Sequence, residues 1–324
     1  MPDVTKDQIT EAAEAAELDA HAAPLVEKPG GGDAKKEKAR SLWGDAWYEL
    51  RHRPMFWVSS ILLFVLIVIA IFPGLFTSVS PRDGDLVHHY LSKPEYTHVF
   101  QADWFGYDQQ GRSLYARVIY GTRASITVGV CVTAAVTVVG GLLGLLAGYF
   151  GGWIDSIISR IVDIFFGIPF LLGTMVVLNA FVDRKVYVVI LALAFLGWTS
   201  IARVMRSSVI TAKQADYVTA ARALGAGTNR ILFRHVLPNA IAPTIVVATI
   251  ALGGYIGAEA TLSFLGLGLG DPTISWGIDI SEGSKVIRDD PHALLFPAGM
   301  LTLTVFAFIM LGDAVRDALD PKLR

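Results

Sequence analysis

Residues 216–240 read DYVTAARALGAGTNRILFRHVLPNA, a charged segment around a glycine that lies between two apolar stretches. Small or apolar side chains recur in it at i, i+3, i+4 and i+7, the spacing of one helix face, at Tyr217, Ala220, Ala221 and Leu224. Gly225 follows, and glycine readily adopts the left-handed conformation that ends many helices. The segment therefore predicts a short helix that begins near Asp216 and ends in a glycine turn.

The same segment predicts a second helix after the turn. Thr228 or Asn229 is expected to cap it, and it runs towards Val236, where Pro238 ends it before the next apolar stretch. An isolated helix this short is marginal in water, so it needs a packing partner. A docking element for a soluble protein and a helix lying on lipid headgroups both fit this pattern, and docking is favoured.

The composition of the whole chain indicates a membrane protein. Of its 324 residues 53% are hydrophobic and only 17% are charged, and the formal net charge of −2 gives no indication of a nucleic-acid partner. A bilayer core needs about 20 apolar residues in a helix. Stretches of this kind are residues 55–76, 124–154, 164–182, 186–202, 240–258 and 293–312. The predicted fold class is all-α, a polytopic membrane protein with about six transmembrane helices embedded in lipid.

The topology follows from basic residues close to the spans. Before the first span lie Lys35, Lys36, Lys38, Arg40, Arg51 and Arg53, which place the N-terminus in the cytoplasm. Six crossings return the C-terminus to the same side. Residues 1–40 have too few large apolar side chains to form a core and are expected to be disordered. The predicted divisions are a cytoplasmic tail 1–40, a juxtamembrane segment and first helix 41–76, an extracytoplasmic loop 77–121, a five-helix core 122–313 with cytoplasmic loop 212–238, and a cytoplasmic tail 314–324.

A few residues in or near the spans carry further predictions. Three glycines at four-residue spacing, Gly140, Gly144 and Gly148, predict a face that packs closely on another helix, within the chain or in a second subunit. Glu259 follows an apolar run and either faces a translocation path or makes a structural hydrogen bond. Asp163 is expected to pair with Arg160. The only cysteine, Cys131, is expected to pack as a small apolar residue.

No metal site is expected. His88, His89 and His98 lie in the outer loop without cysteines or a spaced set of acidic ligands, so they are interpreted as surface histidines.

Residues 216–240 resemble the EAA loop of ABC-importer permeases, whose pattern is EAA, three residues, Gly, nine residues and I-x-L-P. The positions that match are Thr219, Ala220, Ala221, Gly225, Leu237 and Pro238. Thr219 replaces the acidic residue and His235 replaces the isoleucine, a change common in the peptide-importer branch. Loss of the acidic residue puts one cap or interface salt bridge in doubt, and Asp216 lies close enough to supply a negative charge.

The resemblance extends from about Phe105 to the C-terminus. Residues 105–112, FGYDQQGR, resemble the FGTDxxGRD sequence of dipeptide, oligopeptide and nickel permeases. Further matches are EATLSFLGLG at 259–268, SWG at 275–277, and LGD with RDALDP at 311–321. The chain thus resembles the C-type permease subunit of a peptide-class importer.

The resemblance implies a type I ABC-importer permease bundle with a cytoplasmic coupling helix, in the inner membrane. Such a permease pairs with a B-type permease, two cytoplasmic ATPase subunits grip the EAA loops, and an extracytoplasmic binding protein delivers the substrate. Because the chain has no GxxxxGK[ST] phosphate loop, ATP and Mg²⁺ are expected on the ATPase partners and no cofactor on this chain, which is not itself an enzyme.

Other functions remain to be weighed against this one. A secondary transporter would use Glu259 or Asp163 as a proton relay, but it leaves the docking pattern unexplained. A lipid hydrolase would need a nucleophile with a base, and no convincing Ser-His-acid set is present. The substrate stays open among dipeptides, longer peptides, nickel chelates and glutathione.

Overall fold

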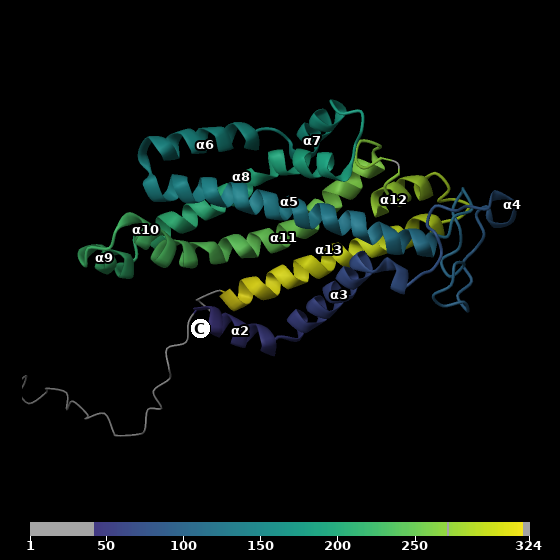
Figure 1. The fold of residues 1–324 in the computed structure, drawn as a ribbon, viewed down its shortest axis with the longest axis horizontal. Coiled ribbons are helices and arrows are strands. Elements are labelled where there is room, and N and C mark those ends of the chain that lie inside the picture. The colour runs from purple at the N-terminus through teal and green to yellow at the C-terminus, as the bar shows by residue number, and fades with distance from the viewer. Residues whose placement is uncertain (1–41, 271, 320–324) are drawn as a thin grey trace, which may run out of the picture. The chain divides into compact units, whose positions relative to one another are not determined.

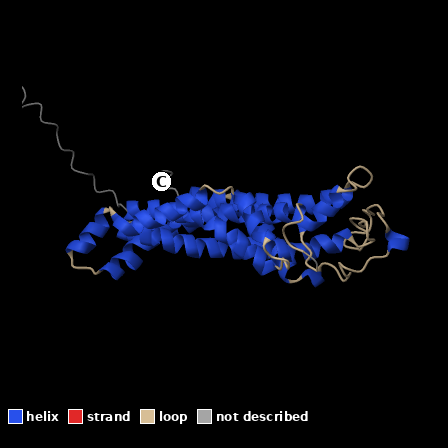
Figure 2. Ribbon diagram, turned by 90° about the horizontal axis from the view of Figure 1, so that it is seen from above, coloured by secondary structure: helices blue, strands red, loops and turns tan. Residues whose placement is uncertain are grey.

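Helices dominate the computed structural model, which describes residues 42–270 and 272–319 (Figure 1). The predicted disordered tail 1–40 and the last five residues of the predicted C-terminal tail lie outside this range. Within it, five helices are long and apolar enough to cross a bilayer, and a bent helix pair makes a sixth candidate. Outside the helices, the described backbone pairs in isolated bridges, Gly84 with Arg112 and Tyr107 with Ser113, and Figure 2 shows loops between helices. The predicted all-α membrane fold is confirmed.

The five long helices each correspond to one predicted span. They are α3 (Pro54–Ile71), α5 (Leu114–Phe150), α8 (Val186–Lys213), α11 (Leu237–Phe264) and α13 (His292–Leu319). The third predicted span, residues 164–182, is different: in its place lies a bent pair, α6 (Gly152–Phe166) and α7 (Phe170–Asn179), whose axes meet at 83° and which begins before the predicted start. Pro169, which has no N–H to donate, is the N-cap residue of α7 and lies at this break.

Short elements connect the long helices. They are α2 (Leu42–His52), η1 (Pro73–Leu75), α4 (Leu86–His89), α9 (Asp216–Ala223), α10 (Thr228–Ile231), the π-helical turn η2 (Leu232–Val236) and α12 (Trp276–Ser284). Helix α9 and the end of α13 lie at one end of the helix bundle, and α4 lies at the other (Figure 1). An ion pair of 2.6 Å between Arg53 Nη1 and Asp317 Oδ2 joins the α2–α3 junction to the end of α13.

Helices α5 and α8 are in close backbone contact along a glycine seam, the face formed by Gly140, Gly144 and Gly148. A Cβ atom added to these glycines would lie 2.4 Å from the carbonyl oxygen of Trp198, 2.4 Å from that of Ala202 and 2.8 Å from that of Arg206, respectively. Only glycine permits such an approach, so the predicted packing face lies against another helix of the same chain.

Several helices extend beyond the predicted spans because protein, not lipid, covers their ends. Helix α5 begins at Leu114 rather than 124, since the Ser113 hydroxyl accepts a hydrogen bond from the Ala116 N–H and Tyr115 and Arg117 are buried. Its first turns therefore lie inside the predicted outer loop 77–121. Helix α13 continues to Leu319, so the first part of the predicted tail 314–324 is helical.

Candidate functional site

Helix α9 ends in the glycine turn that the sequence predicts. The N–H of Gly225 donates to the carbonyl of Arg222 and the N–H of Ala226 donates to the carbonyl of Ala221, both at 3.0 Å. These two bonds define a Schellman motif, which satisfies carbonyl groups at the end of a helix. Gly225 has φ +80°, a conformation that is strained for a residue with a side chain.

The two faces of this segment have different environments. Its inner face is apolar and fully buried, and it packs against α8 and α11 through Val218, Ile231, Leu232 and Val236 in contact with Val209 and Ala240. The predicted stripe lies on the outer face: Tyr217 and Ala220 are exposed, Ala221 is half-buried and Leu224 is 89% exposed. Val218 therefore holds the helix to the spans, while the stripe is free in this chain for contact with another molecule.

The second half of the segment differs from the prediction. The N-cap residue of α10 is Gly227, without a side-chain hydrogen bond, so the expected cap by Thr228 or Asn229 is wrong. After one turn the chain continues as η2 and then as α11, with Leu237 and Pro238 at the start of α11. Proline is tolerated in a first turn, where its missing N–H would have no partner in any case, so Pro238 begins this helix instead of ending the previous one.

The charged residues of the segment make few contacts within the chain. Asp216 lies in the first turn of α9, where a negative charge is favoured by the helix dipole, and Thr219 is exposed at the position of the missing acidic residue. Lys213 at the end of α8 donates to the Tyr149 carbonyl at 2.6 Å, which ties α8 to the end of α5.

Glu259 is completely buried between α5 and α11. Its carboxylate accepts hydrogen bonds from the hydroxyls of Ser125, at 3.1 Å, and Ser263, at 2.8 Å. The Ser263 oxygen in turn accepts from the N–H of Leu269 at 3.0 Å. This placement fits the structural hydrogen bond that the sequence left open, and a role in the translocation path stays a prediction.

Two further sequence expectations concern ionic contacts. Asp163 pairs with Arg203 of α8, at 2.9 Å, and not with Arg160, because α6 lies beside the extension of α8 beyond its predicted end. In the predicted outer loop 77–121, His88 pairs with Asp85 and His98 with Asp103, each at 2.7 Å. Across the described residues no group of three or more His, Cys, Asp or Glu side chains is arranged to hold a metal ion.

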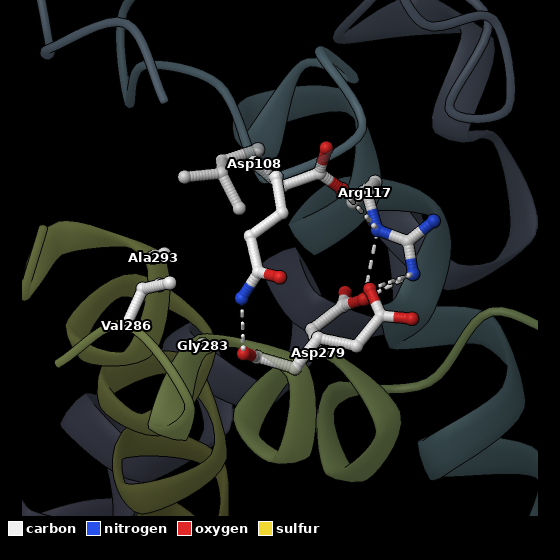
Figure 3. Close-up of a pocket in the computed structure, with 9 residues that line it drawn as sticks. Asp108, Arg117, Asp279, Gly283, Val286 and Ala293 are labelled. Atoms are coloured by element: carbon white, nitrogen blue, oxygen red, sulfur yellow. Dashed lines mark hydrogen bonds and ion pairs between the residues drawn. The ribbon is translucent and has the colours of Figure 1, made fainter. Parts of the chain in front are cut away.

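The sequence did not predict a buried charge cluster (Figure 3), which joins α5 to α12 near the α4 end of the bundle (Figure 1). Arg117 of α5 pairs with Asp279 of α12 and lies 3.7 Å from Asp108, while Arg112 bridges Asp108, at 2.7 Å, and Glu282, at 2.5 Å. The cavity among them is about 10 Å³, room for about one water molecule. This cluster joins the loop that precedes α5 to α5 and α12.

Desolvation is the main influence on Asp279 in that cluster. Burial raises the pKa of the Asp279 carboxyl to about 6, although the Arg117 guanidinium acts in the opposite direction. The Oδ2 atom of Asp279 is buried and accepts no hydrogen bond from the described residues. A signal for the cluster was present in the sequence, because Arg117 adjoins an apolar stretch and a cation there requires a partner.

Comparison with known families adds to this geometry. Residues 140–324 match the binding-protein-dependent transport system inner membrane component family, and residues 41–94 match the N-terminal TM domain of oligopeptide transport permease C.

Individual relatives agree with these matches. The chain is 37% identical over 295 residues to the oligopeptide transport system permease protein OppC of Bacillus subtilis (strain 168), covering 90% of this chain and 94% of the relative. It is 36% identical to the dipeptide transport system permease protein DppC of Alkalihalophilus pseudofirmus, covering 94% of this chain and 98% of the relative. It is also 36% identical to the glutathione transport system permease protein GsiD of Escherichia coli O6:K15:H31, covering 90% and 94%. The chain therefore belongs to the binding-protein-dependent transport system inner membrane component family, as a non-catalytic, multi-pass ABC-importer permease of the oligopeptide and dipeptide class.

Proposed function

We propose that this chain imports short peptides as one of two permease subunits, and that the α9 segment couples it to cytoplasmic ATPase subunits. The relatives named for oligopeptide, dipeptide and glutathione transport support a peptide as the substrate. The observation that carries the coupling role is Leu224, which is 89% exposed at the tip of a helix whose opposite face is buried. An apolar side chain this exposed in water, on an element held rigidly from behind, suits a groove on a partner protein.

The packing of α9 explains how a force applied there would reach the membrane. Val218 is completely buried in a cluster that includes Leu145 of α5, Met205 of α8 and Ala240 of α11. A displacement of α9 therefore moves three spans together, because close-packed interiors transmit strain. ATP and Mg²⁺ are assigned to the ATPase partners, whose hydrolysis cycle would supply that displacement.

The proposed assembly contains this chain, a B-type permease, two ATPase subunits and an extracytoplasmic binding protein. Basic residues support the orientation, with both termini and α9 in the cytoplasm. Arg203, Arg206 and Lys213 lie in the second half of α8, towards the end that leads to α9, where the positive-inside rule expects basic residues if that end is cytoplasmic. The α4 end of the bundle then faces the binding protein.

The test is Leu224→Asp in proteoliposomes that contain the partner permease, the ATPases and the binding protein. Burying a leucine side chain at an interface contributes about 1.5–3 kcal/mol, so this variant should bind the ATPases roughly tenfold to hundredfold more weakly and lose ATP-driven peptide uptake. Leu224→Met is the matched control, because methionine keeps the volume and apolar character.

Three separate results would contradict the coupling role, the peptide substrate and the need for ATPase partners. Uptake by the Leu224→Asp complex at the wild-type rate would contradict coupling through α9. ATP-driven uptake of a nickel chelate but of no peptide would contradict the peptide assignment. Uptake by this chain alone, driven by a proton gradient, would contradict the need for ATPase partners.

A further inference from the structure

The break between α6 and α7 leaves polar backbone groups within a membrane span. The axes of the two helices meet at 83°. In the connection, the N–H of Gly167 donates to the carbonyl of Asp163 and the N–H of Ile168 donates to the carbonyl of Phe165, both at 3.1 Å and both within α6. The first N–H groups of α7 have no acceptor in their own helix, and its N-cap residue, Pro169, provides no side-chain cap. Such backbone is tolerated in a bilayer only where protein covers it or where it lines a water-filled cavity.

A cavity of about 500 Å³ lies at this break. Its walls come from the α6–α7 connection, from Thr199 and Ser200 of α8, and from Ala251, Gly254 and Tyr255 of α11, and none of the residues that line it is charged. Thr199 and Ser200 are at the middle of α8 in sequence, and Ala251 and Gly254 are near the middle of α11, so the cavity lies about halfway along both helices. In secondary transporters built on broken helices, substrate sites lie where the interrupted helices meet near the bilayer midplane.

A second cavity of similar size has a more apolar lining and serves as a comparison. It measures about 580 Å³ between α5, α7 and α8, and its lining includes Val139, Leu191, Phe195 and Trp198. Neither a helix break nor a serine or threonine contributes to it. Acyl chains suit that groove. The cavity at the break combines hydroxyl groups with an interrupted backbone, and these favour an aqueous occupant.

We infer that the transported peptide crosses the middle of the membrane through the cavity at the α6–α7 break, and that Gly254 sets the size of side chain that passes. This inference rests on the proposed function. The uncharged lining with hydroxyls suits peptide amides and does not select one charged side chain. At Gly254 an added Cβ meets no atom within 4 Å, whereas at neighbouring Gly253 it would lie 3.1 Å from the Val305 carbonyl oxygen. Position 254 therefore faces open space.

The first test uses Gly254→Ala and Gly254→Phe in the complete importer, with uptake of trialanine and triphenylalanine measured separately. A Cβ at position 254 meets no atom within 4 Å, and both alanine and phenylalanine are better helix formers than glycine. We expect Gly254→Phe to reduce triphenylalanine uptake at least tenfold more than trialanine uptake, while ATPase activity stimulated by the binding protein is kept. Gly254→Ala should show the same order with a smaller effect.

The matched control is Gly299→Phe. Gly299 is an exposed helical glycine of α13 at which an added Cβ also meets no atom within 4 Å, and it does not line the cavity. Equal uptake of both peptides by wild type, Gly299→Phe and Gly254→Phe would overturn the inference and leave the proposed function intact. Absence of ATP-driven peptide uptake in the wild-type complex would instead refute the proposed function.

A second measurement does not depend on turnover. In a Cys131→Ser background, a cysteine replaces either Ser200 in the cavity or Leu191 in the apolar groove, and a water-soluble thiol reagent is added to the complete importer. We expect Ser200→Cys to be labelled at least tenfold faster than Leu191→Cys, and trialanine presented with the binding protein and ATP to slow that labelling. Equal rates at the two positions, or labelling of Ser200→Cys that trialanine leaves unchanged, would overturn the inference.

Discussion

Replacing Gly225 tests whether the shape of the α9 turn is required for coupling. The residue has φ +80°, a left-handed conformation that costs a residue with a side chain about 1–2 kcal/mol. No atom lies within 4 Å of an added Cβ, so within this chain the cost is backbone strain and not a clash. Gly225→Val should therefore reduce the population of the native turn by a factor of about 5 to 30.

Two matched variants separate the turn from the surface around it. Gly227 lies two residues further on at φ −70°, with open space around an added Cβ, so Gly227→Ala should leave the turn unchanged. Gly225→Asn adds a side chain at the same place, but asparagine tolerates the left-handed region. If uptake falls in Gly225→Val but is kept in Gly225→Asn, the backbone conformation of the turn is what coupling requires. If uptake is lost in both variants, coupling instead requires the surface around residue 225 to be free of a side chain.

The assay compares ATP-driven peptide uptake with ATPase activity in proteoliposomes. A strained turn reduces the fraction of permease bound to the ATPase subunits, so we expect peptide uptake in Gly225→Val to fall at least fivefold. The amount of ATPase that copurifies with the permease should fall in the same proportion. The reasoning is refuted if Gly225→Val and Gly227→Ala retain the ATPases and transport peptide equally well.

Three other predictions concern the spans and the outer loop. Arg117→Met leaves the Asp279 carboxylate buried without its partner, which should cost about 3–5 kcal/mol. Burial raises the pKa of Asp279 to about 6 while Arg117 acts to lower it, so removing Arg117 should raise this pKa further. The free energy of unfolding of the variant should therefore fall as the pH rises from the unfolded pKa through the raised one, seen as a lower melting temperature at pH 8 than at pH 5. Gly144→Val should prevent α5 and α8 from packing, because its Cβ would lie 2.4 Å from a carbonyl oxygen, whereas Gly141→Val, with its nearest contact at 3.8 Å, should assemble normally in size-exclusion chromatography of the solubilised complex. A hydrogen bond to a carboxylate raises the pKa of His98, so the pair should protect the outer loop from proteolysis below pH ~6.5 and lose that effect as the pH rises through the raised value, and His98→Gln should remove this dependence.

The sequence predicts the spans because their apolar length depends on the bilayer alone. It predicts the glycine turn because the end of α9 needs a left-handed residue, which Gly225 supplies. It does not predict the direction of the stripe around Leu224, since a helical period shows that two faces differ but not which one is buried. That outcome is decided by Val218, a single side chain that fits between α8 and α11.

The break in the third span and the charge cluster depend on contacts distant in sequence. Pro169 marks a local kink, but the 83° bend also depends on α8, which packs against both α6 and α7, and on α11, which packs against α7. Arg117 and Asp279 are separated by 162 positions along the chain and meet only after α12 packs against α5. Likewise, Asp163 pairs with Arg203 because two helices lie side by side, and not because Arg160 is nearer in sequence.

The glycine seam has a mechanical consequence. With carbonyl oxygens of α8 this close to glycines of α5, the two helices cannot slide or tilt independently, and they behave as one stiff strut. Helix α5 has 37 residues, a length of about 55 Å at 1.5 Å per residue, and it extends from the charge cluster near one end to the α9 contacts near the other. Bending is then expected at the α6–α7 break and the π-helical turn η2, and under the proposed coupling a displacement of α9 would be passed along the α5–α8 pair as a unit.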